Sequence, residues 1–262
     1  MVQIRRQRHT IKGVEHEVVR LWPDSREALL PPIILLHEGL GSVAMWKDFP
    51  EKLAKRTGTE IIVYSRAGYG QSDPAKLPRE VRYMHEEGLT VLPELIQSLE
   101  ISNPVLLGHS DGGSIALICA GGTDVELSGL VVMAPHLFVE QITVDSIAKA
   151  REVWASTNLN QRLGKYHDDV ESAFVGWNDI WLDPDFLDWN IEEYLPSIEV
   201  PILAIQGEDD EYGSMAQIDV IARVVAQSEL LKLPRCGHSP HRDQPVAVLE
   251  AVHNFMHQKV IA

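Results

Sequence analysis

The segment around Ser110 strongly constrains how this chain can fold. Residues 105–115 are Val-Leu-Leu-Gly-His-Ser-Asp-Gly-Gly-Ser-Ile, so a short apolar run ends at Gly108 and a small-residue, apolar stretch typical of a buried helix follows Gly113. This is the pattern Gly-x-Ser-x-Gly between an expected strand and an expected helix, which places a serine hydroxyl above the edge of a sheet. The turn is so tight that its neighbours must lack bulky side chains. The backbone N–H after the serine can then face a developing oxyanion.

A serine hydroxyl becomes a good nucleophile only beside a positioned base, and two later loops supply the partners. Residues 202–207 are typical of a buried strand and precede Glu208-Asp209-Asp210-Glu211. The short strand expected at 230–233 precedes Pro234-Arg235-Cys236-Gly237-His238. In a parallel sheet all such loops leave at the carboxyl edge, where residues that are far apart in sequence converge.

Strand-like and helix-like segments alternate along most of the chain, which favours a mostly parallel sheet covered by helices on both faces. Residues 7–21 are expected to form an antiparallel hairpin that turns at Lys12-Gly13. The other expected strands are 33–37, 61–64, 105–108, 130–134, 202–207 and 230–233, and the expected helices are 45–57, 84–100, 112–121, 215–227 and 244–258.

One interval breaks this alternation, because no strand is expected between residues 135 and 201. It holds four of the six tryptophans, and Phe174, Trp177 and Trp181 have the spacing of one helix face. Residues 140–195 also carry twelve acidic and four basic residues. Two interpretations stay open. The aromatic residues pack this segment onto the rest of the protein, or a few of them wall an apolar pocket whose acidic mouth favours neutral or cationic substrates.

Together these features resemble an α/β-hydrolase-fold serine hydrolase over nearly the whole chain. Besides the loops already described, the resemblance includes His37-Glu38-Gly39-Leu40-Gly41-Ser42 and Ser65-Arg66-Ala67-Gly68-Tyr69-Gly70-Gln71-Ser72, each expected to follow a strand. It implies that Ser110 is the nucleophile, His238 the general base and Asp210 the residue that orients the imidazole. Asp210 is preferred to Asp209 because the acid of this family usually stands three residues after the glycine that ends its strand.

The resemblance also implies a division of the chain. Residues 1–135 and 196–262 would form the α/β-hydrolase core, and residues 136–195 would form a helical cap above the catalytic edge. Within the fold, Gly-His-Ser-Asp-Gly-Gly-Ser-Ile-Ala-Leu-Ile is most similar to the same turn of valacyclovir-hydrolase-like esterases.

The loop that would stabilise the oxyanion departs from the family pattern, which is His-Gly-x, because this chain has His37-Glu38-Gly39. Matched by position, the backbone N–H groups of Gly39 and Asp111 would form the oxyanion hole. A free carboxylate beside a developing oxyanion would be unfavourable by about 4 kcal/mol at roughly 4 Å and an effective dielectric near 20. Glu38 is therefore expected to point away, to be hydrogen-bonded or to meet a cationic group. It is either a structural carboxylate or a residue that handles substrate or water.

The candidates for substrate binding are Glu38, Asp111, His136, Trp177 and Trp181. The Asp111 carboxylate either stabilises the N-terminus of its helix or binds a substrate ammonium group, as its counterpart in valacyclovir-hydrolase-like esterases suggests. His136 comes just after an expected strand and would line the pocket. His241, three residues after His238, is a weaker alternative as the base.

Composition narrows the class of protein. The net charge of −15 at pH 7 argues against nucleic acid and anionic membranes as partners, because both require cationic patches. The apolar runs are shorter than a membrane span and the N-terminus lacks the core of a signal peptide, so a cytoplasmic location is expected. Cys119 and Cys236 do not indicate a disulfide framework. No metal-ligand spacing or phosphate-binding loop is found, so no metal and no cofactor is expected, and a homo-oligomer is an open option.

The sequence therefore predicts a cofactor-independent hydrolase that cleaves a small carboxylic ester through an acyl-enzyme. Two alternatives stay open. The same three residues would equally serve carbon–carbon bond hydrolysis of the meta-cleavage-product type, a lyase-like reaction or an amidase, because a fold alone does not decide the chemistry. The alternative from another class is a ligand-binding protein with little turnover.

Overall fold

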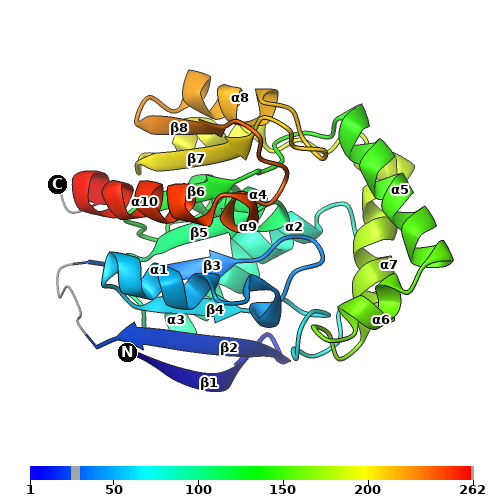
Figure 1. Ribbon diagram of the computed structural model, residues 1–262, viewed down its shortest axis with the longest axis horizontal. Coiled ribbons are helices and arrows are strands. Elements are labelled where there is room, and N and C mark those ends of the chain that lie inside the picture. Colours follow the sequence, from blue (N-terminus) through cyan, green and yellow to red (C-terminus); the bar gives the residue numbers. More distant parts are fainter. Residues whose placement is uncertain (25–29, 261–262) are drawn as a thin grey trace.

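A computed structural model describes residues 1–24 and 30–260 of the 262-residue chain. Within these residues, eight strands form one sheet in the order β1-β2-β4-β3-β5-β6-β7-β8 (Figure 1). The strands are β1 (Val2–Ile11), β2 (Val14–Pro23), β3 (Ile33–Leu36), β4 (Ile61–Tyr64), β5 (Val105–His109), β6 (Gly129–Met133), β7 (Ile202–Gly207) and β8 (Ser228–Leu233).

The strands from β4 to β8 in this order run parallel, and the hairpin β1–β2 adds to β4 in the antiparallel direction. The hairpin turns at Lys12 and Gly13, which both have positive φ. This confirms the mostly parallel sheet and the hairpin predicted from the sequence, although the hairpin strands extend beyond residues 7–21. Because the parallel strands share one direction, the loops that follow them leave at one edge.

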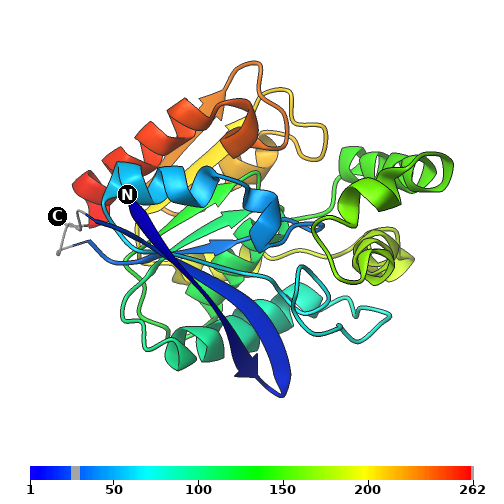
Figure 2. The same ribbon diagram turned by 60° about the horizontal axis from the view of Figure 1, so that its bottom comes forward.

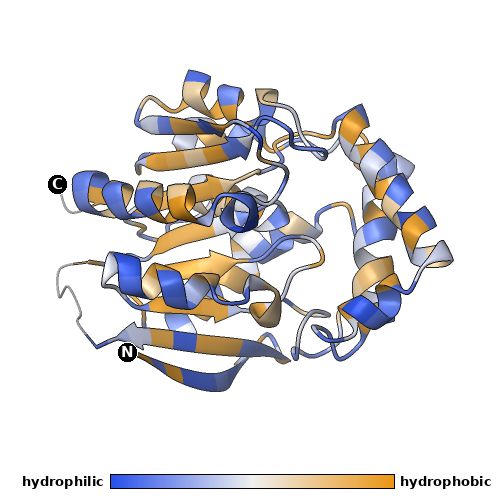
Figure 3. Ribbon diagram, viewed as in Figure 1, coloured by the Kyte–Doolittle hydropathy of each residue, from blue (hydrophilic) through white to orange (hydrophobic). Residues whose placement is uncertain are grey.

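The central strands are buried on both faces, which explains why their sequences are continuously apolar rather than alternating. In β5, Leu106 packs in one hydrophobic cluster, while Val105 and Leu107 pack in the other, as the two-residue period of a strand requires. Figure 3 shows this apolar centre, with hydrophilic residues on the surrounding helices, the loops and the outer strands.

Helices cover both faces of the sheet (Figure 2). On one face, α1 (Phe49–Thr57) and α10 (Pro245–Phe255) contribute to one hydrophobic cluster; on the other, α3 (Leu92–Ser98), α4 (Asp111–Gly122) and α8 (Ala216–Val224) contribute to the second. The short helices α2 (Tyr83–Glu86) and α9 (Pro240–Asp243) lie next to α3 and α10 in the sequence. In the described part of the chain, no helix combines the length and the apolar character that crossing a membrane requires.

Two expected helices are interrupted. The helix expected at 84–100 consists of α2, a π-helical turn at Glu87–Val91 and α3. Pro93 explains the interruption, because it lacks the N–H that would bond to the carbonyl four residues earlier. The helix expected at 45–57 is divided at Lys47, whose φ of 53° ends the 3₁₀ turn Val43–Trp46 before α1 begins.

Between β6 and β7 the chain leaves the sheet and forms a helical insertion. Figure 1 shows it as a separate group beyond the carboxyl edge of the sheet. Phe174, Trp177 and Trp181 are buried on one of its helices, as their spacing predicts. The boundaries of a cap at 136–195 stay a prediction. The insertion comprises α5 (Gln141–Ser156), α6 (Leu159–Leu163), α7 (Val170–Trp181) and 3₁₀ turns at Pro184–Phe186 and Glu192–Ser197.

Candidate active site

Ser110 lies on the turn from β5 to α4 with φ 53° and ψ −122°, a conformation that residues other than glycine rarely adopt. The neighbouring glycines are required by contact. A Cβ atom at Gly108 would collide with the backbone of Gly112, and one at Gly112 would collide with the carbonyl group of Leu36. The structure thus contains the sharp strand-to-helix turn that the sequence predicts, and strain of this kind is concentrated at functional sites.

Three loops bring Ser110, His238 and Asp210 together at the carboxyl edge. The Oγ atom of Ser110 lies 2.9 Å from Nε2 of His238. On the other side of the ring, Nδ1 lies 2.8 Å and 3.0 Å from the two carboxylate oxygens of Asp210. Asp210 is only 7% exposed, whereas the adjacent Asp209 is exposed. Of the two aspartates that the sequence offers, Asp210 is therefore the one that contacts the histidine.

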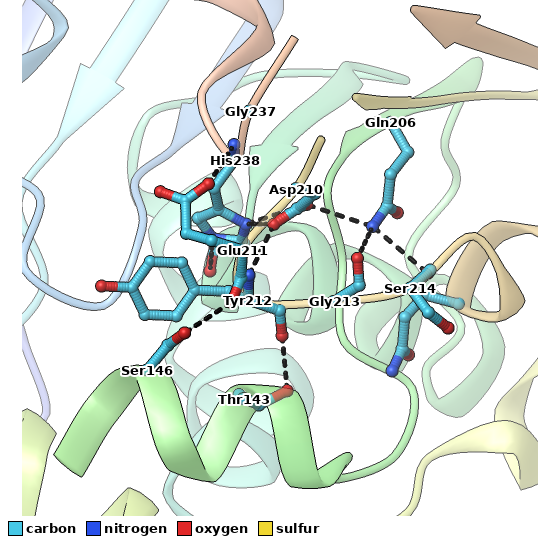
Figure 4. A network of polar contacts seen from close by, with 12 residues as sticks. Thr143, Ser146, Gln206, Asp210, Glu211, Tyr212, Gly213, Ser214, Gly237 and His238 are labelled. Carbon is cyan, nitrogen blue, oxygen red and sulfur yellow. Dashed lines mark hydrogen bonds and ion pairs between the residues drawn. The ribbon is translucent and has the colours of Figure 1, made fainter. Parts of the chain in front are cut away.

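Two neighbours that the sequence analysis did not identify hold the Asp210 carboxylate. The side-chain amide of Gln206 donates to Oδ2 at 3.1 Å, and the backbone N–H of Tyr212 donates to Oδ1 at 2.8 Å (Figure 4). Burial alone would raise the pKa of Asp210, but the bonds from His238 and Tyr212 outweigh it and hold the pKa below its usual value. Asp210 is therefore an ionised partner for His238. A polar residue inside the apolar strand β7 is the sequence signal that could have identified Gln206.

The helical insertion holds this acidic loop from the outside. From α5, the hydroxyl of Thr143 donates to the carbonyl oxygen of Tyr212, and that of Ser146 donates to the carbonyl oxygen of Glu211 at 2.6 Å (Figure 4). The Glu211 carboxylate in turn accepts the backbone N–H of His238 at 3.2 Å. One helix of the insertion thus fixes the loop that carries the acid.

The carboxylate of Glu38 is paired. Its Oε1 accepts a hydrogen bond at 3.0 Å from Arg242 of α9, and its Oε2 lies 3.5 Å from Nδ1 of His109. Burial alone would raise the pKa of Glu38, but His109 and Arg242 outweigh it and hold the pKa well below its usual value. This is the hydrogen-bonded, cation-paired carboxylate that the electrostatic argument from the sequence expects.

Asp111 also has partners within the protein. The Tyr83 hydroxyl donates to its Oδ2 at 2.6 Å, and a guanidinium nitrogen of Arg66 lies 3.9 Å from the same oxygen. Asp111 and Arg66 are both 1% exposed, and Oδ1 of Asp111 has no hydrogen-bond partner among the described residues. Arg66 also donates to the carbonyl oxygens of His37 and Glu38, so it connects this carboxylate to the loop after β3.

A small cavity of about 120 Å³ opens onto Ser110 and His238. Gly39 lines it, and a Cβ atom there would collide with the indole ring of Trp177, so the insertion closes directly over this loop. As the first residue of α4, Asp111 has a backbone N–H without an acceptor inside the helix.

A larger open cleft of about 580 Å³, between the hairpin and residues 74–91, does not include Ser110. The active-site cavity is lined by all five substrate-binding candidates, Glu38, Asp111, His136, Trp177 and Trp181, and by Ile147 and Tyr212, which the sequence analysis did not select.

The two other histidines considered from the sequence lie beside the site without bonding to Ser110. His136 packs edge-on against Trp181, with ring centroids 4.9 Å apart, and its ring centroid lies 5.7 Å from that of His238. Burial, followed by the neighbouring His238, lowers the pKa of His136 to about 3. His241 packs against Trp46 and His109, and neither of its ring nitrogens has a hydrogen-bond partner among the described residues. The described residues contain no cluster of three side chains suited to holding a metal ion.

Comparison with known proteins supports the fold and the hydrolase family. The sequence matches the alpha/beta hydrolase family over residues 33–251. The sn-1-specific diacylglycerol lipase ABHD11 of Danio rerio is 23% identical over 260 residues, which cover 86% of this chain and 78% of the lipase. A proline iminopeptidase of Lactobacillus delbrueckii subsp. lactis is 31% identical over 144 residues, which cover 55% of this chain and 45% of that protein. The crystal structure of proline iminopeptidase from Mycobacterium smegmatis superposes with a TM-score of 0.77 at 18% identity, covering 98% of this chain and 99% of that one. The fold class predicted from the sequence is confirmed.

Proposed function

Because the chain belongs to the alpha/beta hydrolase family, we propose that it is a serine hydrolase that cleaves a small, neutral carboxylic ester through an acyl-enzyme. The observation that carries the proposal is the continuous hydrogen-bonded chain from Ser110 through His238 to Asp210. A serine in this setting has both a base within reach and an acid that orients the base.

In the proposed mechanism, Oγ of Ser110 attacks the acyl carbon while Nε2 of His238 accepts its proton. The alcohol leaves with that proton, and His238 then activates the water that hydrolyses the acyl-enzyme. Asp210 keeps the second ring proton on Nδ1 and stabilises the imidazolium. The backbone N–H groups of Gly39 and Asp111 donate to the oxyanion, and one such donor typically contributes about 3–4 kcal/mol to transition-state stabilisation.

The cavity supports a small substrate. A volume of about 120 Å³ corresponds to roughly four water molecules at about 30 Å³ each. A short acyl group fits this space, whereas a fatty acyl chain would have to extend beyond it. Both acidic residues on the cavity wall have cationic partners, Arg242 for Glu38 and Arg66 for Asp111. This pairing favours a neutral substrate over a cationic one.

The finer similarity to valacyclovir-hydrolase-like esterases is a secondary proposal. It gives Asp111 the role of binding a substrate ammonium group through the oxygen that has no partner among the described residues, Oδ1. An ammonium group there would share the carboxylate with Tyr83 and Arg66. Substrates with and without an amino group distinguish this role from a purely structural one.

The test is turnover by wild type and Ser110→Ala of four substrates: a short p-nitrophenyl ester, an amino-acid benzyl ester, an acyl-CoA and a vinylogous diketone acid. We expect ester hydrolysis by the wild type and its loss in Ser110→Ala, with unchanged thermal unfolding. Ser98→Ala, on the exposed end of α3, is the matched control and is expected to behave as wild type. Substantial ester turnover by Ser110→Ala would refute the mechanism.

The same panel separates the alternatives. Serine-dependent cleavage of the diketone acid without ester turnover would assign the protein to the carbon–carbon bond hydrolases. A wild-type protein that turns over none of the four substrates and forms no stoichiometric adduct with a fluorophosphonate would instead be a ligand-binding protein.

A further inference from the structure

Three loops of the proposed active site meet at the carboxylate of Glu38. Glu38 follows β3 and directly precedes Gly39 in the oxyanion loop. His109, which lies 3.5 Å from one carboxylate oxygen, ends β5 directly before Ser110. Arg242, which donates to the other oxygen at 3.0 Å, lies on α9, four residues after His238. A single carboxylate therefore joins the loops that carry the proposed oxyanion amide, nucleophile and base.

The two ring nitrogens of His109 each face an oxygen. Nε2 lies 2.7 Å from the backbone carbonyl oxygen of His238, and because a carbonyl oxygen only accepts hydrogen bonds, Nε2 carries a proton. Nδ1 lies 3.5 Å from Oε2 of Glu38, which is an ion-pair distance and not a hydrogen bond. A neutral ring would turn a lone pair toward this carboxylate, whereas a ring with both nitrogens protonated turns a positive charge toward it. His109 is 1% exposed, so solvent does not screen the contact.

We propose that Glu38 and His109 are positioning residues of the hydrolase, joined with Arg242 in an ionic network in which both ring nitrogens of His109 are protonated. The catalytic consequence rests on the proposed function. His109 holds the backbone of His238, and Glu38 holds the loop that carries Gly39, so base and oxyanion amide keep fixed places relative to Ser110. Displacements of about 1 Å in such groups can lower rates by about a hundredfold.

The charges around the network are consistent with this arrangement. Against the effect of burial, His109 and Arg242 hold the pKa of Glu38 well below its usual value. Arg66 donates to the backbone carbonyl oxygens of His37 and Glu38.

Two histidine rings lie beside His109. The ring of His238, with Asp210 beyond it, lies 5.2 Å from that of His109. His241 packs 4.9 Å from His109, and burial lowers its pKa well below the usual value, so it is neutral at pH 7. The network carries one net positive charge, because Arg242 and protonated His109 are positive and Glu38 is negative. A free glutamate would instead place a negative charge near the oxyanion.

The protonation state can be measured without any substrate. In ¹⁵N-labelled wild-type protein at pH 7, NMR of the histidine side chains is expected to show protons on both ring nitrogens of His109. Glu38→Gln removes the negative partner, so His109 is expected to lose the proton on Nδ1 and to keep the one on Nε2. A neutral His109 ring in the wild type overturns the proposal, whatever the activity of the protein.

The positioning role is measured through the reactivity of Ser110. A fluorophosphonate reacts when the serine oxygen attacks phosphorus, fluoride leaves and the serine proton passes to His238, so its inactivation rate reports the assembled site without a known substrate. For Glu38→Gln we expect this rate to fall about tenfold to a hundredfold. For ester turnover we expect kcat to fall with little change in KM. Glu38→Asp keeps the charge and is expected to recover part of the loss.

The matched control is Glu250→Gln. It removes the same charge from an ion pair with Arg56 on the protein surface and is expected to react as wild type. A Glu38→Gln variant that folds and reacts with the fluorophosphonate as fast as wild type refutes the positioning role.

A second variant is used if Glu38→Gln does not fold. Arg242→Gln, at a partly exposed residue, is also expected to slow the reaction with the fluorophosphonate, and an unchanged rate refutes the positioning role. If the wild type itself forms no adduct and hydrolyses no ester, the proposed function fails, and the NMR result alone then decides the state of the network.

Discussion

Substituting His136 tests whether burial of a neutral histidine beside the active site makes the free energy of unfolding decrease at acidic pH. His136 is 2% exposed, and its Nδ1 has no hydrogen-bond partner among the described residues. Burial and the neighbouring His238 lower its pKa from 6.5 to about 3. The folded protein therefore keeps this ring neutral at pH values where the unfolded chain protonates it.

The sign of the effect follows from proton linkage. Between pH 6.5 and about 3 the unfolded state binds one more proton at His136 than the folded state, so the free energy of unfolding decreases as the pH falls. The decrease is about 1.4 kcal/mol per pH unit, or about 2 kcal/mol between pH 8 and pH 5. The stability that His136 contributes is thus fully present above pH 6.5 and is lost on acidification. His37 and His241, whose pKa values burial also lowers, act in the same direction.

The assay is urea unfolding of wild type and His136→Gln, followed by circular dichroism at pH 8 and pH 5. Glutamine does not titrate, so the free energy of unfolding of the variant should decrease by about 2 kcal/mol less than that of the wild type over this range. The difference at pH 8, where both side chains are neutral, measures lost packing and is the internal control. Equal decreases in the two proteins would refute the argument that His136 is buried in its neutral form.

Two further predictions concern the cavity. The kcat/KM of p-nitrophenyl esters should rise about fourfold per methylene, at about 0.8 kcal/mol each, from acetyl to butyryl and then fall by octanoyl. Ile147→Ala, which removes three carbons from the cavity wall, should move this optimum to longer chains. A wild-type rate that keeps rising to octanoyl would contradict the argument that the cavity limits the length of the acyl group. Asp111→Asn should lower the turnover of neutral and amino-acid esters by similar factors, because Tyr83 already donates to Oδ2 and Arg66 compensates the charge of the carboxylate. A loss confined to the amino-acid esters would instead establish the ammonium-binding role.

The sequence was sufficient to predict the sheet and the convergence of three loops at its carboxyl edge. The physical reasons can be identified. Strands buried on both faces must be continuously apolar, so β3, β5 and β7 stand out as short runs. The glycines beside Ser110 are required by backbone contacts that no other residue permits, so the turn is visible as a pattern. The helix expected at 84–100 was wrong in being continuous, and Pro93 is the residue that could have indicated its interruption, since proline cannot donate the helical hydrogen bond.

Contacts between side chains on different loops could not be predicted from the sequence in the same way. The argument from charge required Glu38 to meet a cation, but the cation is Arg242, and the two residues are 204 positions apart. Which of the basic side chains reaches Glu38 depends on the path of the chain through α9, and no local pattern encodes that path. The hydrogen bonds from Thr143 and Ser146 to backbone carbonyl groups are harder still to anticipate, because any hydroxyl at the right place would form them.

Helix α5 links the size of the cavity to the orientation of the acid. Ile147 of this helix forms part of the cavity wall, while Thr143 and Ser146, within the same turn, hold the backbone of residues 211 and 212. Glu140, just before the helix, accepts from the backbone N–H and the hydroxyl of Ser214, at the end of the same acidic loop. Moving α5 outward to admit a larger acyl group would break these bonds, at about 1 kcal/mol each. It would also release the loop that holds Asp210 against His238. A substrate too large for the cavity is therefore disfavoured twice, by the space it needs and by the loss of the geometry that would activate Ser110.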